Sequence, residues 1–201
     1  MARYTGPRNK RARRIGQDLG LKTNPKSLER RINTLPGTHG RKGKGKVSDF
    51  GIQLNEKQKA KAIYGILERQ FKQYYIKASR NPQATGQVML SLLERRLDNA
   101  VYRLGFAPTR RAARQLVTHG NVKVDGKKVD IASYQTKPGQ TISIAEKAQK
   151  FIFVSPNLTD KVVPSKWLSR TATEGKIDRL PTREEIGSDI KENLIIEFYS
   201  R

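Results

Sequence analysis

Residues 108–129 read PTRRAARQLVTHGNVKVDGKKV. This stretch predicts a helix that begins after an N-cap residue, Thr109, and ends at Gly120. A short strand follows in which valine and lysine alternate, and Asp125-Gly126 supplies the tight turn of a hairpin that leads into a second strand. A helix followed directly by a small basic hairpin is therefore expected here.

The predicted helix has two chemically different faces. Each residue is rotated by about 100° from the one before it, so the apolar residues gather on one side and the basic residues on the other. The apolar side comprises Ala112, Ala113, Leu116 and Val117. Because this side packs against the rest of the domain, the arginines of the other side are expected to point outward from a rigid support.

The basic side of the helix and the hairpin together form a candidate binding surface, the helix–hairpin surface. Its residues are Arg110, Arg111, Arg114, Gln115, His119, Asn121, Lys123, Lys127 and Lys128. Cations at fixed separations suit the phosphates of a folded RNA. At the junction, His119 and Asn121 are expected to reach a ribose or a base edge, although His119 is equally consistent with a cation at a helix C-terminus.

The whole chain is strongly basic. Lys and Arg number 41 against 18 Asp and Glu among 201 residues, which gives a net charge of +23 and a pI near 10.5. The charge is uneven, since residues 1–46 hold 14 basic and 2 acidic residues, whereas residues 151–201 hold 8 of each. Such an asymmetric excess indicates a surface that binds a polyanion rather than general solubility.

Several classes of protein are disfavoured by what the sequence lacks. There is no cysteine, and His39 and His119 lie far apart, so we expect no disulfide and no metal site. No apolar run approaches the ~18 residues of a membrane span. The first residues lack the apolar stretch of a secretory signal, so the mature protein is expected to begin here, in a reducing compartment.

Residues 40–46 have the spacing of a phosphate-binding loop, Gly-x4-Gly-Lys. That motif requires a preceding buried strand and a following Ser or Thr that holds magnesium. Val47 occupies the position of the Ser or Thr, and residues 31–40 do not have the pattern of a buried strand. We therefore expect no nucleotide hydrolysis and no cofactor.

Residues 1–46 are interpreted as a basic N-terminal arm. Residues 35–46, LPGTHGRKGKGK, are expected to have no regular structure because of their Gly and Pro content. The arm is expected to be mobile when free and to order on a polyanion. Its candidate phosphate-binding residues are Arg3, Arg8, Lys10, Arg11, Arg13, Arg14, Arg41, Lys42, Lys44 and Lys46.

Two further helices are predicted between the arm and residue 108. The first begins at a capping box, Asn55 with Gln58, and has apolar residues at three- and four-residue spacing as far as Ala78. The second spans residues 89–105. It contains Arg96-Leu97-Asp98, which resembles the catalytic motif of pseudouridine synthases. The residues that usually follow that motif are absent, so a salt bridge on the helix surface is expected instead.

The remainder of the chain predicts further strands. Residues 141–144, 151–154 and 167–168 are expected to be strands, and residues 174–176 a hairpin turn. The tail begins helical and ends in an apolar run, Leu194–Phe198, for which a helix packed on the helical part and an edge strand both remain open. The fold class is therefore predicted to be α+β.

The expected division of the chain follows these patterns. A helical domain is expected over residues 47–90, with the tail 181–201 packing on it. An RNA-binding module with an extended antiparallel sheet is expected over residues 91–180, and its core over residues 91–150. The rigid helix–hairpin surface is interpreted as the specific reader of RNA, and the arm as a non-specific anchor.

The chain resembles a known family. ERRLDNAVYRLG (94–105), the stretch 107–129 and PGQTISI (138–144) resemble an RNA-binding module that occurs in translation proteins, synthases and tRNA ligases. Nearly the whole chain is similar to the bacterial-type small-subunit ribosomal protein family number four, universal family four. The further matching motifs are ARYTGPR (2–8), LPGTHG (35–40), EKQKAKAIYGILERQF (56–71), PSKWL (164–168) and EFYSR (197–201).

The resemblance implies a structural ribosomal protein rather than an enzyme. It implies binding to a multi-helix junction in the 5′ domain of the small-subunit ribosomal RNA, early in assembly. It also implies a place beside the channel through which messenger RNA enters, contact with the fifth small-subunit protein, and an influence on translational accuracy. The implied location is the ribosome of a bacterial cytoplasm or of a plastid. The alternative is an RNA-modifying enzyme of the pseudouridine-synthase type that has the same module.

Two departures from the family pattern stand out. Many relatives fold the arm around a zinc site of four cysteines, which this chain lacks, so RNA is expected to order the arm. The usual Asn-Gly of the hairpin turn is Asp125-Gly126 here, which keeps the turn but places a negative charge near phosphate.

Overall fold

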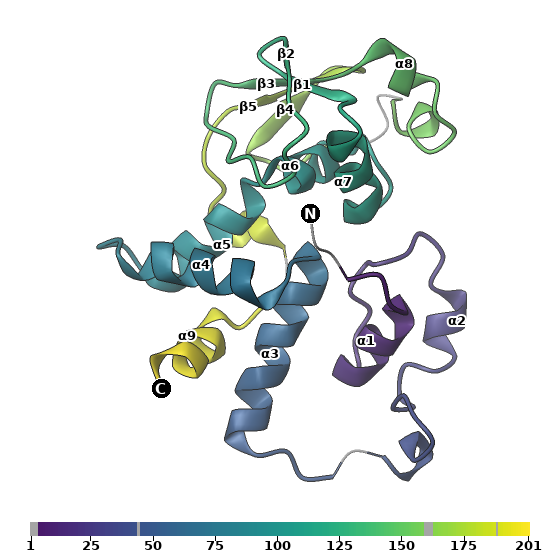
Figure 1. Ribbon diagram of the computed structural model, residues 1–201, viewed down its shortest axis with the longest axis vertical. Coiled ribbons are helices and arrows are strands. Elements are labelled where there is room, and N and C mark those ends of the chain that lie inside the picture. Colours follow the sequence, from purple (N-terminus) through teal and green to yellow (C-terminus); the bar gives the residue numbers. More distant parts are fainter. Residues whose placement is uncertain (1–3, 44, 159–162, 188) are drawn as a thin grey trace. The chain divides into compact units, whose positions relative to one another are not determined.

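The computed structural model describes residues 4–43, 45–158, 163–187 and 189–201. The chain forms two compact units (Figure 1). Unit 1 comprises residues 1–86 together with residues 188–201, and unit 2 comprises residues 87–187. Helices and a small antiparallel sheet are both present, so the predicted α+β class is confirmed. No helix in the described part of the chain is long and apolar enough to cross a membrane.

Unit 2 is built on an antiparallel sheet whose strand order is β2-β1-β3-β5-β4. Its strands are β1 (Val122–Val124), β2 (Lys127–Lys128), β3 (Thr141–Ile144), β4 (Leu168–Arg170) and β5 (Glu174–Ile177). Its helices are α5 (Thr85–Glu94), of which the first two residues belong to unit 1, α6 (Leu97–Arg103), α7 (Arg110–Thr118) and α8 (Glu146–Gln149). Two 3-10 helices, η2 (Ser155–Asn157) and η3 (Glu184–Ile186), complete it.

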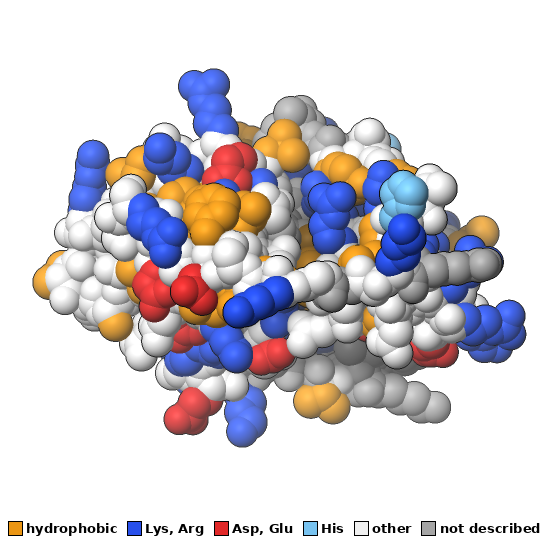
Figure 2. All heavy atoms as spheres, turned by 90° about the horizontal axis from the view of Figure 1, so that it is seen from below, with side chains coloured by type: hydrophobic (Ala, Val, Ile, Leu, Met, Phe, Trp, Pro, Cys, Tyr) orange, Lys and Arg blue, Asp and Glu red, His pale blue; other side chains and the backbone are white. Residues whose placement is uncertain are grey.

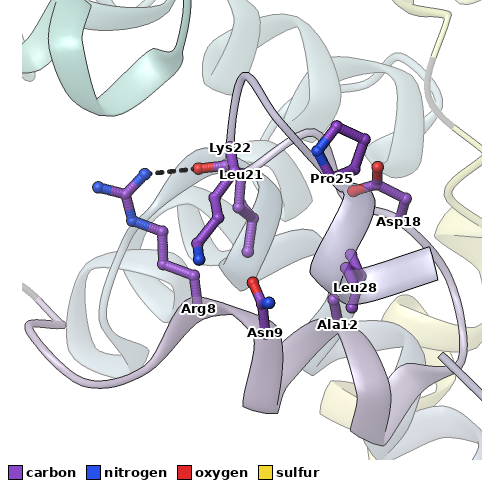
Figure 3. Close-up of a pocket in the computed structure, with 8 residues that line it drawn as sticks. All are labelled: Arg8, Asn9, Ala12, Asp18, Leu21, Lys22, Pro25 and Leu28. Atoms are coloured by element: carbon purple, nitrogen blue, oxygen red, sulfur yellow. Dashed lines mark hydrogen bonds between the residues drawn. The ribbon is translucent and has the colours of Figure 1, made fainter. Parts of the chain in front are cut away.

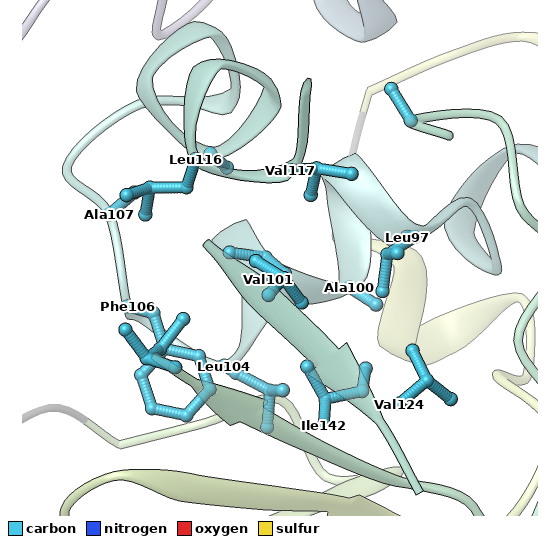
Figure 4. Packing of buried hydrophobic residues seen from close by; sticks show 14 of the residues in the cluster. Leu97, Ala100, Val101, Leu104, Phe106, Ala107, Leu116, Val117, Val124 and Ile142 are labelled. Carbon is cyan, nitrogen blue, oxygen red and sulfur yellow. The ribbon is translucent and has the colours of Figure 1, made fainter. Parts of the chain in front are cut away.

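The core of unit 2 lies between one face of the sheet and the helices α6 and α7 (Figure 4). Alternation along β1 and β3 turns their valines and isoleucines to this side, where Val124 and Ile142 are paired in register. Leu104 approaches β5 so closely that a Cβ on Gly175 would lie 2.4 Å from its Cδ2 atom. Glycine at this position therefore allows α6 to pack directly on the sheet.

The predicted hairpin is confirmed. Asp125 and Gly126 have φ of 49° and 76°, the two left-handed positions that a type I′ turn requires. The predicted strand at residues 141–144 is confirmed as β3, and Leu168 begins β4 directly after Trp167.

Two predictions for the second half of unit 2 are wrong. Residues 151–154 form turns rather than a strand, because Ala148, Phe151 and Val154 recur every three residues and turn toward the core as a helical segment would. Residues 174–176 belong to strand β5 rather than to a turn. Gly175 was interpreted as a turn residue, but it accommodates Leu104 instead.

The predicted helix over residues 89–105 is two helices. Arg96, between α5 and α6, has an extended backbone with φ −64° and ψ 137°, and it forms an isolated β-bridge with Gln135. The carbonyl of Arg95 accepts hydrogen bonds from the Thr136 backbone N–H and hydroxyl, both at 2.9 Å. These contacts with a distant segment interrupt the helix, and the apolar spacing does not reveal them.

Unit 1 contains α1 (Arg8–Ile15), α2 (Lys26–Glu29), η1 (Gly40–Lys42), α3 (Asp49–Tyr64), α4 (Glu68–Ser79) and α9 (Glu192–Ser200). The predicted start at Asn55 is wrong, since Ser48 is the N-cap of α3 and its hydroxyl accepts from the Gly51 N–H at 3.3 Å. The predicted continuous helix to Ala78 is also wrong. Gly65, with φ of 65°, ends α3, and α4 begins three residues later.

The arm has helices and internal contacts of its own, so the expectation of no regular structure in residues 35–46 is wrong for η1. Ala12 on α1 and Leu28 on α2 are both buried. Arg8 donates to the Leu21 carbonyl at 2.7 Å (Figure 3), and Asn9 donates to the Ser27 hydroxyl at 3.1 Å. The arm therefore has a small apolar contact that hydrogen bonds stabilise, and it contains no cysteine. Its mobility in the free protein stays a prediction.

The apolar tail forms helix α9, which packs on α3 within unit 1. Phe198 lies 5.4 Å from Phe50, and Tyr199 stacks on Tyr75 at 4.8 Å, measured between ring centroids. A Cβ on Gly86 would lie 2.6 Å from the Glu192 Cγ atom, so glycine allows the close approach of α9 there. Of the two alternatives for the tail, the helix is the one observed.

Glu68 joins α3, α4 and α9 through charged hydrogen bonds. Its carboxylate accepts from Lys57 at 3.0 Å, from Lys61 at 2.7 Å and from the Tyr199 hydroxyl at 2.6 Å. Burial by itself raises the pKa of Glu68, but the hydrogen bonds from Lys61, Tyr199 and Lys57 outweigh it and lower the pKa to about 2. The ionised form of Glu68 therefore stabilises the packing of α9.

Replacement of Glu68 by Gln is expected to loosen α9. Because the Glu68 side chain is 45% exposed and water screens its ion pairs, we expect a cost of only about 1 kcal/mol. Hydrogen exchange of the α9 amides should become about fivefold faster at pH 7. The exposed Glu29→Gln is the matched control.

The same contact has a defined pH dependence. A carboxylate with a lowered folded-state pKa stabilises the fold above its ordinary pKa of 4.5, and this contribution is lost as the pH falls from there toward about 2. Protection of α9 should therefore decline over this range in the wild type and stay nearly constant in Glu68→Gln. An equal decline in both proteins would contradict the assignment.

Candidate nucleic-acid interface

The helix–hairpin surface lies on α7, β1 and β2 of unit 2. The Thr109 hydroxyl accepts from the Ala112 N–H at 3.2 Å and begins α7, as predicted. The chain leaves α7 through Gly120, whose φ is 66°. Ala113, Leu116 and Val117 are buried, so the predicted apolar face of α7 is confirmed.

Most of the predicted residues of this surface are exposed. Arg111, Gln115 and His119 are exposed on or next to α7. On the hairpin the exposed residues are Lys123, Lys127 and Lys128. Lys123 is paired directly with Lys128 across the two strands. Like charges in this position destabilise a free hairpin, and a bound polyanion would reverse the sign of that contribution.

Gly120 has a second role at the junction of α7 and β1. A Cβ at this position would lie 2.1 Å from the Lys128 Cε atom. The stem of Lys128 therefore crosses directly over the Gly120 backbone. Its position brings a hairpin cation next to the end of α7.

Arg110 is held on a chain of hydrogen bonds. Its Nε donates to the Asn99 Oδ1 at 2.8 Å, and its guanidinium lies 4.5 Å from the centre of the Tyr102 ring. Asn99 in turn donates to the buried Glu94 carboxylate at 2.7 Å, which also accepts from Arg103 at 2.8 and 2.9 Å. Arg110 is therefore preoriented and only partly buried, which suits a cation that meets one phosphate in one direction.

Arg114 does not point outward, and that expectation is wrong. It is 8% exposed, and its Nη1 lies 3.9 Å from the Asp98 Oδ2. Asp98 is itself buried and accepts from Arg96 at 3.0 and 2.7 Å. Asp98 lies at the start of α6, which packs on α7, and its buried carboxylate attracts Arg114 inward.

Asn121 is also buried, at 4% exposed, so the expectation that it reaches a ribose or base edge is wrong. Its backbone N–H donates to the Leu116 carbonyl, and its carbonyl accepts from the Ala145 N–H, both at 3.0 Å. These bonds fix the connection from α7 into the sheet. His119, two residues earlier in the junction, is exposed.

The turn residue Asp125 uses its carboxylate within the protein. Its Oδ1 accepts from the Thr141 N–H at 2.8 Å, and its Oδ2 accepts from Gln140 at 3.0 Å. The negative charge of Asp125 is therefore engaged with the start of β3.

Lys176 is a candidate that the sequence interpretation missed. It is exposed on β5 and is paired with Thr141 on one side and with Ser169 on the other. Because residues two apart on a strand share a face, Thr141 lies on the same face as Ser143, which is paired with Lys123. The alternation of polar residues with Gly and Ile in Glu174–Ile177 is compatible with a strand, but Gly175 favoured the prediction of a turn.

The candidate residues of the arm fall into three groups. Lys10, Arg14, Lys42 and Lys46 are exposed. Arg8, Arg11 and Arg13 are partly buried and contact other parts of the arm. Arg3 and Lys44 lie outside the described residues, and Arg41 is described only as part of the η1 backbone. Figure 2 shows Lys and Arg side chains spread over the visible face, with Asp and Glu in smaller groups.

The synthase-like motif is not an open site. Asp98 is 4% exposed and is paired with Arg96, so the predicted surface salt bridge is a buried ion pair. A uridine base has no access to a carboxylate that is enclosed in this way. Within the part of the chain that the structure describes, there is also no cluster of three or more His, Asp or Glu residues suited to a metal ion.

The fold and the basic surface define a nucleic-acid-binding protein of the S4-domain class. The family described as "S4 domain" matches residues 95–142, which include α6, α7, the hairpin and the start of β3. The family described as "Ribosomal protein S4/S9 N-terminal domain" matches residues 3–94.

Full-length relatives identify the family more closely. The chain is 48% identical to a small ribosomal subunit protein uS4 from Methylibium petroleiphilum, and 50% identical to proteins of that name from Akkermansia muciniphila and Xanthomonas campestris pv. campestris. Each match covers 100% of both chains. The chain belongs to the uS4 family of small ribosomal subunit proteins, a family of structural ribosomal proteins rather than enzymes. The resemblance predicted from the sequence motifs is thereby confirmed.

The burial of Arg114 predicts a difference between two neighbouring arginines. Arg114→Ala should lower the free energy of unfolding of unit 2 by about 1–3 kcal/mol, because the buried Asp98 then loses one of its two cations. Arg111→Ala should change it by no more than about 0.5 kcal/mol. Trp167, the single tryptophan of the chain, is buried in unit 2, so its fluorescence in a urea titration reports this transition. Equal effects of the two substitutions would contradict the structural role of Arg114.

Proposed function

We propose that this protein is a structural component of the small ribosomal subunit that binds ribosomal RNA through the helix–hairpin surface. The observation that supports this most directly is the set of exposed cations on a rigid frame. Arg111 stands on a helix whose opposite side is buried, and Lys123 and Lys128 stand on strands paired with the rest of the sheet. A preoriented array of this kind favours one spacing of phosphates over others.

The finer role follows from the resemblance of the whole chain to the family. We place the RNA target in the multi-helix junction of the 5′ domain, bound early in assembly. The protein then lies beside the channel through which messenger RNA enters, next to the fifth small-subunit protein, and influences translational accuracy. The relatives come from bacteria, which supports a place in the ribosome of the bacterial cytoplasm.

Each group of residues has a distinct part in the proposed binding. Arg110 and Arg111 offer planar guanidinium groups that bind phosphate through two parallel hydrogen bonds. The lysines of the hairpin act as point charges along the adjoining strand of RNA. His119 and Gln115, which are exposed beside them, are placed for contacts with a ribose or base edge. Arg114 and Asn121 contribute indirectly, since they hold α7 and the junction in position.

The arm adds phosphate contacts through its exposed cations Lys10, Arg14, Lys42 and Lys46. Arg8, Arg11 and Arg13 remain candidates for RNA contact, although each also contacts another part of the arm. The competing proposal, an RNA-modifying enzyme, has no support from a reactive group, because Asp98 is enclosed by arginines.

Binding to ribosomal RNA should weaken steeply with salt. If the helix–hairpin surface neutralises about four phosphates, the slope of log K against log of the salt concentration should be about −3. A filter-binding or fluorescence-anisotropy titration between low and moderate salt measures this slope. A slope near zero on small-subunit ribosomal RNA would show that phosphate contacts do not dominate.

Arg111→Ala should weaken binding to that RNA by about 1–2 kcal/mol without lowering stability. Arg80, which is exposed on unit 1 at the end of α4, is the matched control, and Arg80→Ala should bind like the wild type. As a test of the ribosomal role, the protein should co-sediment with small subunits after a high-salt wash. Complete release by that wash would argue against a structural component.

A further inference from the structure

Unit 1 contains a second basic site, in a hollow between α1 and α3. The volume of this hollow is about 310 Å³, and its lining residues are Tyr4, Lys10, Arg11, Arg14, Ile15, Asn55 and Gln58. Three of these side chains are cations, and none is acidic. A different hollow of the arm, between α1 and the segment of Leu21 and Leu28 (Figure 3), has only about 10 Å³, little more than one water-sized sphere.

The cations of the α1–α3 hollow come from one helix. Lys10 and Arg14 are one turn apart on α1, so they lie on the same side of the helix. Both are exposed, and neither forms an ion pair with another residue that the structure describes. The positive charge of Lys10 and Arg14 is therefore not neutralised within the described part of the chain.

The other side of the hollow is formed by two amides. Asn55 and Gln58 are three residues apart on α3, so they too lie on one side of their helix. They do not form the predicted capping box, because Ser48 caps α3, and both amides are exposed within the helix. Each amide offers a donor and an acceptor, the combination that reads the edge of a base.

A flat stacked pair completes the lining. The Arg11 guanidinium carbon lies 3.4 Å from the centre of the Tyr4 ring. A Cβ on Gly6 would lie 2.6 Å from the Tyr4 hydroxyl oxygen, so glycine allows the ring to fold back beside α1. Guanidinium planes and aromatic rings are the groups on which proteins stack unpaired bases.

We propose that the α1–α3 hollow holds one unpaired nucleotide of the bound RNA. Lys10 and Arg14 bind its phosphate, Asn55 and Gln58 bind the edge of its base, and the Arg11–Tyr4 pair lies against the face of the base. The volume is at the lower end of the range of sites that enclose small organic ligands. This inference rests on the proposed function, because it assumes that the ligand is RNA.

The proposed site changes the part that the arm has in recognition. A purely electrostatic anchor needs only cations, because every phosphate is alike. Amides opposite a flat stacked pair add contacts that a phosphate cannot use. The arm together with α3 therefore selects an RNA that presents an unpaired base, rather than any run of phosphates.

The test compares two RNAs that differ at one position. One is a hairpin RNA with a single unpaired 2-aminopurine, and the other is the same hairpin with that base paired. The full-length wild-type protein should bind the first about tenfold more tightly, since one stacked base contributes about that factor, and its 2-aminopurine fluorescence should decrease on binding. Asn55→Ala/Gln58→Ala should abolish both the preference and the fluorescence change.

Matched variants separate this site from the proposed interface. Alanine is a strong helix former, so the double variant keeps α3 intact, and the exposed Gln73→Ala on α4 is its control. Arg111→Ala should weaken binding of both RNAs equally and leave the preference unchanged. If Arg111→Ala did not weaken the binding of either RNA, this would count against the proposed interface and not against the α1–α3 hollow.

Three results would overturn the nucleotide site itself. The first is equal binding of both RNAs by the wild type, and the second is a tenfold preference that persists in Asn55→Ala/Gln58→Ala. The third is a preference that depends on Lys10 and Arg14 but not on the amides. That last result would make the hollow a phosphate site that does not read a base.

Discussion

Two buried carboxylates hold the arginine-rich part of unit 2 together. Glu94, at the end of α5, accepts hydrogen bonds from Arg103 and from Asn99, and Asn99 positions Arg110. Asp98, at the start of α6, pairs with Arg96 and faces Arg114. A buried carboxylate is tolerated only when cations and hydrogen bonds compensate its lost hydration. In a chain with a net charge of +23, these two acids give Arg96, Arg103 and Arg114 partners within the protein.

The helix–hairpin surface depends on these pairings. The inward arginines and the apolar face of α7 fix the helix, so that Arg111 projects from a support that does not need to reorganise on binding. The pairing of Lys123 with Lys128 lowers the stability of the free hairpin. Its strands nevertheless stay in register because Val122 and Val124 are buried and paired with Ile144 and Ile142. Apolar packing therefore holds in place a charge pattern that electrostatics alone would disperse.

The arm of unit 1 is held together although it has few apolar residues. Buried Ala12 and Leu28 form a small contact, and arginines donate to backbone carbonyls, as Arg13 does to those of Thr34 and Leu35 at 2.8 and 3.0 Å. The guanidinium groups of the arm therefore satisfy backbone acceptors that lie outside regular helices. At the other end of the unit, Glu68 collects two lysines and Tyr199, and α9 closes over α3. In both places basic side chains have partners within the protein.

Local chemistry was sufficient for the elements whose determinants are adjacent in the chain. The limits of α7, the type I′ turn at Asp125-Gly126, strand β3 and the apolar face of α7 all follow from capping, turn and periodicity rules that act within a few residues. The basic character of the surface followed from composition. The family followed from motifs spread over nearly the whole length of the chain, which the full-length relatives confirmed.

Tertiary structure alone decided the rest. The break between α5 and α6 arises from bonds with residues 134–136, and Gly175 lies in a strand because Leu104 packs on it. A helical wheel places Arg114 beside Arg110, but the wheel contains no information about Asp98 on the neighbouring helix. Asn121 is buried for a similar reason, since Ala145 pairs with its carbonyl. The sequence by itself determined which residues are charged and where helix α7 and the turn at Asp125-Gly126 begin. Whether a particular side chain faces RNA or the protein interior depends on partners distant in sequence, because burial and ion pairing are set by contacts between elements.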